Sequence, residues 1–234
     1  LSISPETGRP SGTPKKALDY PLRNRQWVSW SPDSKKITFE WGKDETGGDI
    51  YTLSVEDGIR TQLTNEPAWE GRPRWSGDGK TIAFNRGTRE LYFIPAEGGT
   101  PKKILDNARP YAWSPDGEWL WYFTGARSML YRRSDGHFFS VACPDGVGDF
   151  LSWSPDGKRA FFYRSSYDYA PAAKAVSTQG GPSFQLGREL SLWPYVQFWS
   201  PDSRMIMTSG GALDAPDLYM FPIAGGKSNT LKLD

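Results

Sequence analysis

One five-residue phrase, Trp-Ser-Pro-Asp-Gly or a near copy of it, occurs five times in this chain of 234 residues. The copies begin at Trp30, Trp75, Trp113, Trp153 and Trp199, so their mean spacing is about 42 residues. A fixed period of this length is typical of solenoids and propellers, in which each repeat is one supersecondary unit. The phrase therefore constrains the fold more than composition does.

The phrase itself predicts a tight turn. Serine, proline, aspartate and glycine in this order fit a type I β-turn, because proline presets φ to about −65° at the second position. The second copy has Gly77 in place of proline, while the first and fifth have Ser34 and Ser203 in place of glycine. These changes leave the turn prediction intact. We expect the tryptophan before each turn to be buried between neighbouring sheets, because so large a ring contributes strongly to a core.

Strand-like segments follow each turn. Branched and aromatic residues are enriched at 36–39, 81–84, 119–123, 159–163 and 205–208. Third strands are expected at 49–55, 90–95, 129–133, 174–177 and 217–222, and each is followed by a turn that contains glycine and leads to a fourth strand. Four antiparallel strands per repeat make one propeller blade. We predict an all-β propeller with five full blades, in a single domain over residues 1–234.

The N-terminus adds part of a further repeat. Residues 1–8 and 13–18 match 91–98 and 100–105, which end the second repeat. We therefore expect an N-terminal half-blade that is ordered by pairing with the neighbouring blade, with the C-terminal blade or with another chain. Five and a half blades fit part of a six-bladed or larger ring, and we expect the chain to be an excised portion of a longer protein.

Charge and composition exclude several functions. Lys and Arg number 28 against 27 for Asp and Glu, so no basic field attracts nucleic acid. No stretch approaches 18 apolar residues, and we expect no membrane insertion. The single cysteine, Cys143, is expected to be a small buried residue, and the single histidine, His137, lies in a short turn. We therefore predict no catalytic residue, metal site or cofactor, and do not expect the chain on its own to be an enzyme.

The repeats resemble the WD-like repeats of TolB-type β-propellers. Blades of that family carry W-S-P-D-G-K followed by an I-A-F strand, then an I-Y strand and a Gly-Gly turn, and the present chain follows this order from Trp75 to Gly99. The resemblance covers nearly the whole chain. It implies a propeller that binds a protein or peptide partner, in an extracytoplasmic or periplasmic location. The number of repeats departs from the six blades typical of the family.

The binding surface is expected on the rim that carries the loops entering each first strand. The turns on the other rim are short and repetitive, whereas these loops vary, and binding is usually placed in variable loops on a repeated scaffold. Aromatic, arginine and acidic side chains gather there, Trp27 among them, and such residues suit a peptide or a sugar. The candidate contacts are Arg25, Trp69, Glu70, Arg72, Arg109, Tyr111, Asp149 and Tyr195.

Three functions fit these observations. The first is a non-catalytic module that binds a protein or peptide across the loop-rich rim. The second is an accessory propeller of a hydrolase, either a prolyl-oligopeptidase-like serine peptidase or an amidohydrolase, which gates or scaffolds a catalytic domain outside this chain. The third is a carbohydrate-binding or polysaccharide-cleaving propeller, motivated by the Trp and Tyr residues of the rim. Glu66 with Glu70, or Asp214 with Asp217, could serve as paired carboxylates for such chemistry, although carboxylates in loops are usually only solvated.

Overall fold

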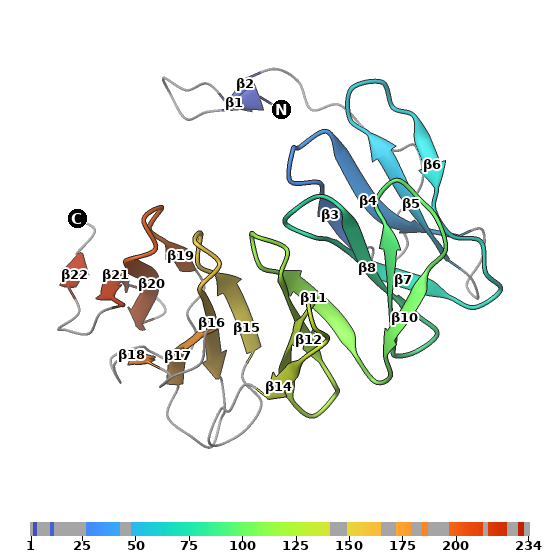
Figure 1. The fold of residues 1–234 in the computed structure, drawn as a ribbon. Helices are drawn as coiled ribbons and strands as arrows, with labels where there is room; N and C mark the ends of the chain where they lie inside the picture. The colour runs from blue at the N-terminus through green and yellow to red at the C-terminus, as the bar shows by residue number, and fades with distance from the viewer. Residues whose placement is uncertain are drawn as a thin grey trace.

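The structure is a computed structural model that describes residues 2–3, 10–11, 27–42, 48–140, 149–164, 172–178, 184–186, 197–212, 215–223 and 229–231. All regular structure within these residues is β-strand. Five antiparallel sheets of four strands follow one another along the chain and are arranged in an arc (Figure 1). The predicted all-β propeller architecture with five full blades is therefore confirmed.

The strands of each blade pair in chain order. Blade 1 contains β3 (Val28–Trp30), β4 (Lys36–Trp41), β5 (Asp49–Ser54) and β6 (Arg60–Gln62). Blade 2 contains β7 (Glu70–Trp75), β8 (Thr81–Arg86), β9 (Glu90–Pro95) and β10 (Lys102–Leu105), and blade 3 contains β11 (Arg109–Trp113), β12 (Trp119–Phe123), β13 (Ser128–Arg132) and β14 (Phe138–Ser140). Blade 4 contains β15 (Asp149–Trp153), β16 (Arg159–Arg164), β17 (Ala172–Ser177) and β18 (Phe184–Leu186). Blade 5 contains β19 (Gln197–Trp199), β20 (Met205–Ala212), β21 (Ala215–Pro222) and β22 (Asn229–Leu231).

Two short strands precede blade 1. The strands β1 (Ser2–Ile3) and β2 (Pro10–Ser11) form a two-stranded antiparallel sheet. Among the described residues these strands pair only with each other, and no pairing of the half-blade with blade 1 or with the C-terminal blade is found there. The returning strand expected at 13–18 lies outside the described residues.

The repeated phrase forms the same turn in all five blades. In blade 2 the backbone N–H of Gly79 donates to the carbonyl of Ser76 at 2.9 Å, and the other four turns have the same bond. The Ser76 hydroxyl donates to Asp78 at 2.6 Å, and Asp78 accepts from the backbone N–H of Lys80. The fourth residue has a positive φ in every copy, including 60° at Ser34. The predicted turn is therefore confirmed, and side-chain hydrogen bonds reinforce it.

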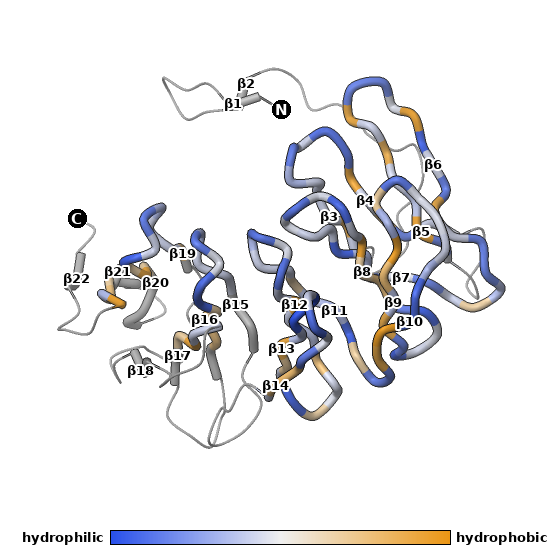
Figure 2. Tube along the Cα trace, in the orientation of Figure 1, coloured by the Kyte–Doolittle hydropathy of each residue, from blue (hydrophilic) through white to orange (hydrophobic). Residues whose placement is uncertain are grey.

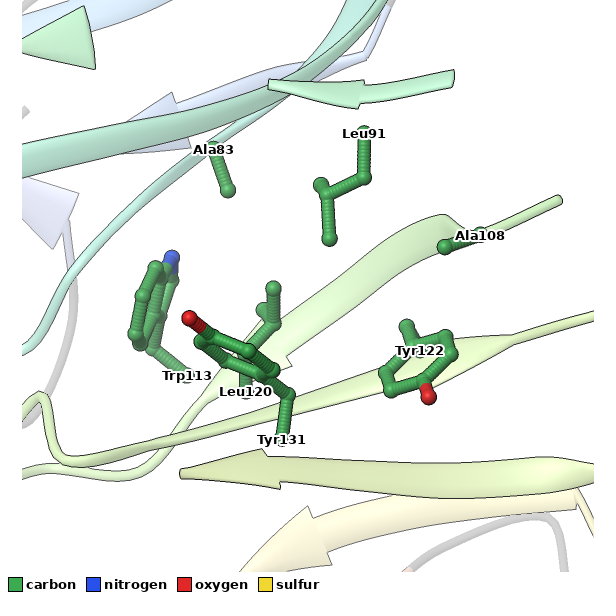
Figure 3. Packing of buried hydrophobic residues seen from close by; sticks show 7 residues of the cluster. All are labelled: Ala83, Leu91, Ala108, Trp113, Leu120, Tyr122 and Tyr131. Atoms are coloured by element: carbon green, nitrogen blue, oxygen red, sulfur yellow. The ribbon is translucent and has the colours of Figure 1, made fainter. Parts of the chain in front are cut away.

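The hydrophobic core lies between successive blades. Hydrophobic residues follow the middle strands of blades 1 to 3, while hydrophilic residues occupy most hairpin tips (Figure 2). Between blades 2 and 3, Trp113, Leu120 and Tyr131 face Ala83 and Leu91 (Figure 3). The indole Nε1 donates to the residue just before the tryptophan of the preceding blade: Trp113 to Arg74, Trp153 to Ala112 and Trp199 to Ser152. These three tryptophans thus bond their blades to the preceding blade, whereas Trp75 Nε1 donates to Gly79 of its own turn.

The prediction that all five tryptophans are buried is confirmed for Trp75 and Trp113, whereas Trp153 and Trp199 are half-buried and Trp30 is exposed. The side chain of Trp30 is 58% exposed, whereas Trp75 and Trp113 are 7% and 8% exposed. Among the described residues no four-stranded blade precedes blade 1, so the partner that covers the other tryptophans is lacking at Trp30. The prediction was wrong there because the burial of this ring depends on the neighbouring blade.

Gly77 has a packing reason for replacing proline in the second turn. A Cβ atom at this position would lie 2.2 Å from the carbonyl oxygen of Pro115, in the corresponding turn of blade 3. Backbone cannot give way as a flexible side chain can, so only glycine fits without rearrangement.

The first strands of blades 2, 3 and 4 each contain a β-bulge. The pairing register shifts between Gly71 and Arg74 in β7, and at the corresponding places in β11 and β15. A bulge inserts an extra residue and redirects the side chains around it. In β7 the bulge holds Arg72 at a φ of 55°, which is uncommon for a residue other than glycine. The start of these strands is therefore where the blades depart from regular pairing.

Candidate functional site

Trp27, which lies just before β3, is at the centre of a cluster formed by blades 1, 2 and 3. The guanidinium carbon of Arg74 lies 4.7 Å from the centroid of the Trp27 ring, and that of Arg72 lies 5.9 Å from it. The Tyr111 ring meets Trp27 edge-on at 6.5 Å between centroids. We call Trp27, Trp69, Arg72, Arg74 and Tyr111 the Trp27 cluster. Three consecutive blades thus bring side chains together near the start of their first strands.

Trp69 and Arg72 form one side of the cluster. The guanidinium carbon of Arg72 is 5.6 Å from the Trp69 ring centroid, and Trp69 Nε1 donates to Glu40 Oε1 at 2.7 Å. Burial raises the pKa of Glu40, against the opposing effects of the Trp69 hydrogen bond and the Arg72 charge. A Cβ atom on Gly71 would lie 2.3 Å from both the Trp69 ring and the Glu40 carboxylate. The glycine therefore makes room for the bond that orients the indole.

Arg74 and Tyr111 form the other side. Arg74 Nε donates to the carbonyl of Tyr111 at 2.6 Å, and its Nη1 donates to the carbonyl of Pro73 at 3.0 Å. Burial lowers the pKa of Arg74 to about 10, and the charge of Arg72 acts in the same direction, whereas Tyr111 opposes it. Arg74 still carries its charge at neutral pH. The Tyr111 ring packs on Trp121 at 4.1 Å between centroids, so the cluster rests on the core between blades 3 and 4.

Glu70 lies in the interior beside this cluster. Its side chain is fully buried, and Oε1 accepts from Arg86 Nε at 2.7 Å. Burial raises the pKa of Glu70, while hydrogen bonds from Thr64 and Arg86 lower it. Arg86 also lies 3.9 Å from Glu66, so the guanidinium stands between the two carboxylates that the sequence offered as a catalytic pair. Glu70 is therefore explained by a structural role, since its buried ion pair with Arg86 supports the start of β7.

Arg109 is the first residue of β11, two positions before Tyr111. Its side chain is half-buried, and its Nε atom is buried without a hydrogen-bond partner among the described residues. Buried donors are nearly always satisfied in folded proteins, so an unsatisfied guanidinium N–H is an exception at the start of this strand.

The structure brings together several of the predicted contacts. Trp69, Arg72 and Tyr111 belong to the Trp27 cluster, Arg109 lies on the strand of Tyr111, and Glu70 is buried beside them. The remaining three are not placed: Arg25 and Tyr195 lie outside the described residues, and Asp149 is described only as the first residue of β15.

Sequence reasoning missed Arg74 and Glu40 and did not select Trp27 as a contact. Arg74 lies two positions after Arg72, but this spacing is no signal for it, because the bulge between Gly71 and Arg74 interrupts the alternation of a regular strand. For Glu40 no signal exists, because it lies on the second strand of another blade and its bond to Trp69 depends on how the blades pack.

The opposite rim carries the repeated turns. His137 is exposed in the turn between β13 and β14, and its backbone N–H donates to Asp135 at 3.0 Å. In the part of the chain that the structure describes, no three His, Cys, Asp or Glu side chains gather in a way that could hold a metal ion. No helix among these residues has the length and apolar character needed to cross a membrane. Cys143 and Asp214 lie outside the described residues.

The comparison with protein families identifies the class of protein. A family model described as the TolB beta propeller domain matches residues 27–191, which is more than half of the chain. The chain therefore belongs to the TolB β-propeller domain family, as the repeated phrase predicts.

Two curated bacterial relatives are longer than this chain. An uncharacterized protein of Agrobacterium fabrum, Atu1656, is 26% identical over 186 residues, which cover 70% of this chain and 61% of the relative. An uncharacterized peptidase of Bacillus subtilis, YuxL, is 34% identical over 147 residues, which cover 62% of this chain and 22% of the peptidase. The chain thus spans less than two thirds of either relative.

Solved structures share the fold. TolB from Acinetobacter baumannii superposes with a TM-score of 0.62 at 19% identity, over 95% of this chain and 57% of that one. A structure from a study of two prolyl endopeptidases gives a TM-score of 0.63 at 15% identity, over 89% of this chain and 35% of that one. At these identities the similarity shows the architecture alone.

Proposed function

We propose that this chain is a non-catalytic β-propeller module that binds a protein or peptide partner through the Trp27 cluster. The observation that carries the proposal is the convergence of Trp27, Arg72, Arg74 and Tyr111 from three blades. Tryptophan, tyrosine and arginine are the residues that most often dominate binding energy at protein interfaces. We also propose that the protein binds this partner outside the cytoplasm.

The cluster is also held in place before any ligand binds. Glu40 bonds to the Trp69 indole, and backbone carbonyls bond to Arg74, so two of the anchors are already oriented. Side chains that are fixed in advance lose less conformational entropy on binding than mobile side chains do. This supports a recognition surface on the rim that carries the strand-entry loops.

A second candidate is an accessory propeller of a peptidase. The similarity to the peptidase YuxL and to a prolyl endopeptidase structure supports it, and the chain covers only a fraction of each. In that case the same rim meets a catalytic domain or the peptide on its way to that domain. The full-length gene separates the two candidates, because a peptidase domain encoded in the same reading frame favours the second.

The proposal is tested with a phage-displayed library of random twelve-residue peptides, selected on the immobilised protein. The affinity of an enriched peptide is then measured by fluorescence anisotropy for the wild type and for the double variant Arg72→Ala with Arg109→Ala. We expect a loss of at least about 30-fold in affinity, since truncating an interface hot spot costs about 2 kcal/mol or more.

The matched control is the double variant His137→Ala with Phe138→Ala, because both residues are exposed near the repeated turns. It should bind the peptide as the wild type does, and thermal unfolding should show that both double variants are folded. The proposal fails if the control loses binding while Arg72→Ala with Arg109→Ala retains it. Enrichment of no peptide, together with binding on an oligosaccharide array, would favour a carbohydrate ligand instead.

A further inference from the structure

The described part of the Trp27 site carries more positive than negative charge. Arg72 and Arg74 lie against the Trp27 ring, and Arg109 begins the neighbouring strand. Two buried or half-buried carboxylates lie close by, and both have partners: Glu40 accepts from an indole and Glu70 from a different arginine. The charge of Arg72 acts on Glu40, whereas among the described residues neither carboxylate forms an ion pair with Arg74 or Arg109.

Arg74 shows the imbalance most directly. Both of its hydrogen bonds go to neutral backbone carbonyls, those of Tyr111 and Pro73. Within the described residues Arg74 forms no ion pair, and its Nη2 atom donates no hydrogen bond. Burying a charge without an opposite charge is costly, and burial already depresses the pKa of this arginine. A bound anion would offset that cost.

Arg109 gives a second and independent observation. Its Nε atom is buried and has no acceptor among the described residues, although a guanidinium N–H is a strong donor. It lies on β11, the strand whose Tyr111 carbonyl accepts from Arg74. Two arginines on adjacent first strands thus have donor capacity that the described protein does not use.

The neighbouring rings favour a planar anion. The guanidinium carbon of Arg74 lies 4.7 Å from the centroid of the Trp27 ring, and this contact together with the two backbone hydrogen bonds limits how the donor fork can turn. A guanidinium held in this way suits a carboxylate, which accepts two parallel N–H bonds in the same plane. Carboxylates are also the ordinary anions of a peptide, carried by Asp and Glu side chains and by the chain terminus.

We infer that the site binds a carboxylate of its peptide ligand, with Arg74 as the main donor and Arg109 as a second donor. This inference rests on the proposed function, and it narrows the ligand to acidic peptides or to peptide C-termini. The aromatic rings of Trp27, Trp69 and Tyr111 then contact the residues next to that carboxylate.

The test compares three forms of a peptide enriched on the wild-type protein: the parent, the same peptide with an amidated C-terminus, and the same peptide with every Asp and Glu replaced by Asn and Gln. We expect one neutralised form to bind at least about tenfold more weakly, since a hydrogen bond between charged groups is worth that much. Which form loses affinity tells a side-chain carboxylate from a terminal one.

The protein side of the test uses Arg74→Gln, with Arg109→Gln as a second variant in case the first unfolds. Each should lower the affinity for the parent peptide about tenfold and leave the affinity for the neutralised form unchanged. Arg74→Lys should retain part of the affinity because it keeps the charge. The matched control is Arg127→Gln, an exposed arginine in the loop between β12 and β13. It should bind all three peptides as the wild type does.

The outcomes separate this inference from the proposed function. If Trp27→Ala abolishes binding but all three peptides bind the wild type equally, the carboxylate inference falls and the binding function stands. It also falls if a neutralised peptide loses affinity equally for the wild type, Arg74→Gln and Arg109→Gln, since the charge then acts elsewhere. If no peptide binds, both the function and the inference are wrong.

Discussion

The tryptophan at the start of the repeated phrase lies in different environments in blade 1 and blade 3. Trp113 in blade 3 is 8% exposed, donates to the Arg74 carbonyl at 3.1 Å and packs on Phe93 of blade 2 at 5.1 Å between ring centroids. Trp30 in blade 1 begins the same phrase but is 58% exposed. The difference shows that this ring stabilises the contact with the preceding blade more than it stabilises the blade that carries it.

The same difference extends to the turns. In blade 2 the carboxylate of Asp78 bonds to Arg133 of blade 3 at 2.6 Å. In blade 1 the equivalent Asp33 bonds to its own turn, through the Ser31 hydroxyl and the Lys35 backbone, and forms no ion pair among the described residues. Near copies of one phrase therefore contribute differently to stability, according to whether a side chain of a neighbouring blade bonds to them.

The largest expected effect compares Trp113→Ala with Trp30→Ala. Trp113→Ala should lower the free energy of unfolding by about 3 to 5 kcal/mol, because it removes a buried ring and leaves a cavity. Trp30→Ala should cost less than about 1 kcal/mol, since most of the ring already contacts solvent. Urea unfolding followed by circular dichroism measures both. Equal losses would mean that a neighbour covers Trp30 in solution.

A smaller effect is expected from Asp78→Asn, compared with Asp33→Asn. Burial raises the pKa of Asp78, but the hydrogen bonds from Arg133 and Ser76 outweigh it and hold the pKa at about 2. A carboxyl group with a depressed pKa stabilises the fold above its unfolded pKa of about 3.9, and this contribution is lost as the pH falls through the folded value. At pH 7 we expect Asp78→Asn to cost about 1 to 2 kcal/mol, after allowance for partial solvent screening.

The pH dependence supplies the check. The difference in stability between the wild type and Asp78→Asn should shrink from pH 4 towards pH 2, measured by thermal unfolding at a series of pH values. Asp33→Asn should have the smaller effect at every pH, because its carboxylate is exposed and lacks the arginine. A loss at Asp33→Asn as large as that at Asp78→Asn would contradict the comparison between blades.

The smallest expected effect concerns the two serines at the fourth turn position. Ser34 and Ser203 have φ values of 60° and 61°, which favour glycine. Ser34 is exposed, so Ser34→Gly should stabilise the protein by about 0.5 to 1 kcal/mol. Ser203 is buried and its hydroxyl accepts from the Asp156 N–H of blade 4 at 3.0 Å, so Ser203→Gly should give no gain. Differential scanning calorimetry distinguishes the two, and an equal rise in Tm would contradict this account.

The fold was predictable because its signal is local and repeated. The turn depends on four adjacent residues, and the strands on either side are rich in branched and aromatic residues, so five copies gave the same answer. The exposure of Trp30 was not predictable in this way, because it depends on a neighbouring blade. The need for glycine at position 77 was not predictable either, because the atom that a larger side chain would meet belongs to Pro115 of the next blade.

The candidate site was predictable only in part. The place of Trp69, Arg72, Arg109 and Tyr111 follows from their distance ahead of the repeated tryptophans. Their side-chain directions do not, because the bulges in β7 and β11 shift the alternation that a regular strand would impose. The importance of Arg74 and the burial of Glu70 emerge only once three blades are packed together.

In blades 3 and 4 the bulge separates two tasks within the first strand. In β11 and β15 the C-terminal end carries the tryptophan that bonds to the preceding blade, and the extra residue of the bulge lies nearer the start, at Tyr111 in β11 and Leu151 in β15. A change of side chain at the extra residue leaves the ladder of backbone bonds and the bond of the tryptophan unaltered. The scaffold can therefore acquire a new ligand by substitution at these few places, one blade at a time, while its folding information stays intact.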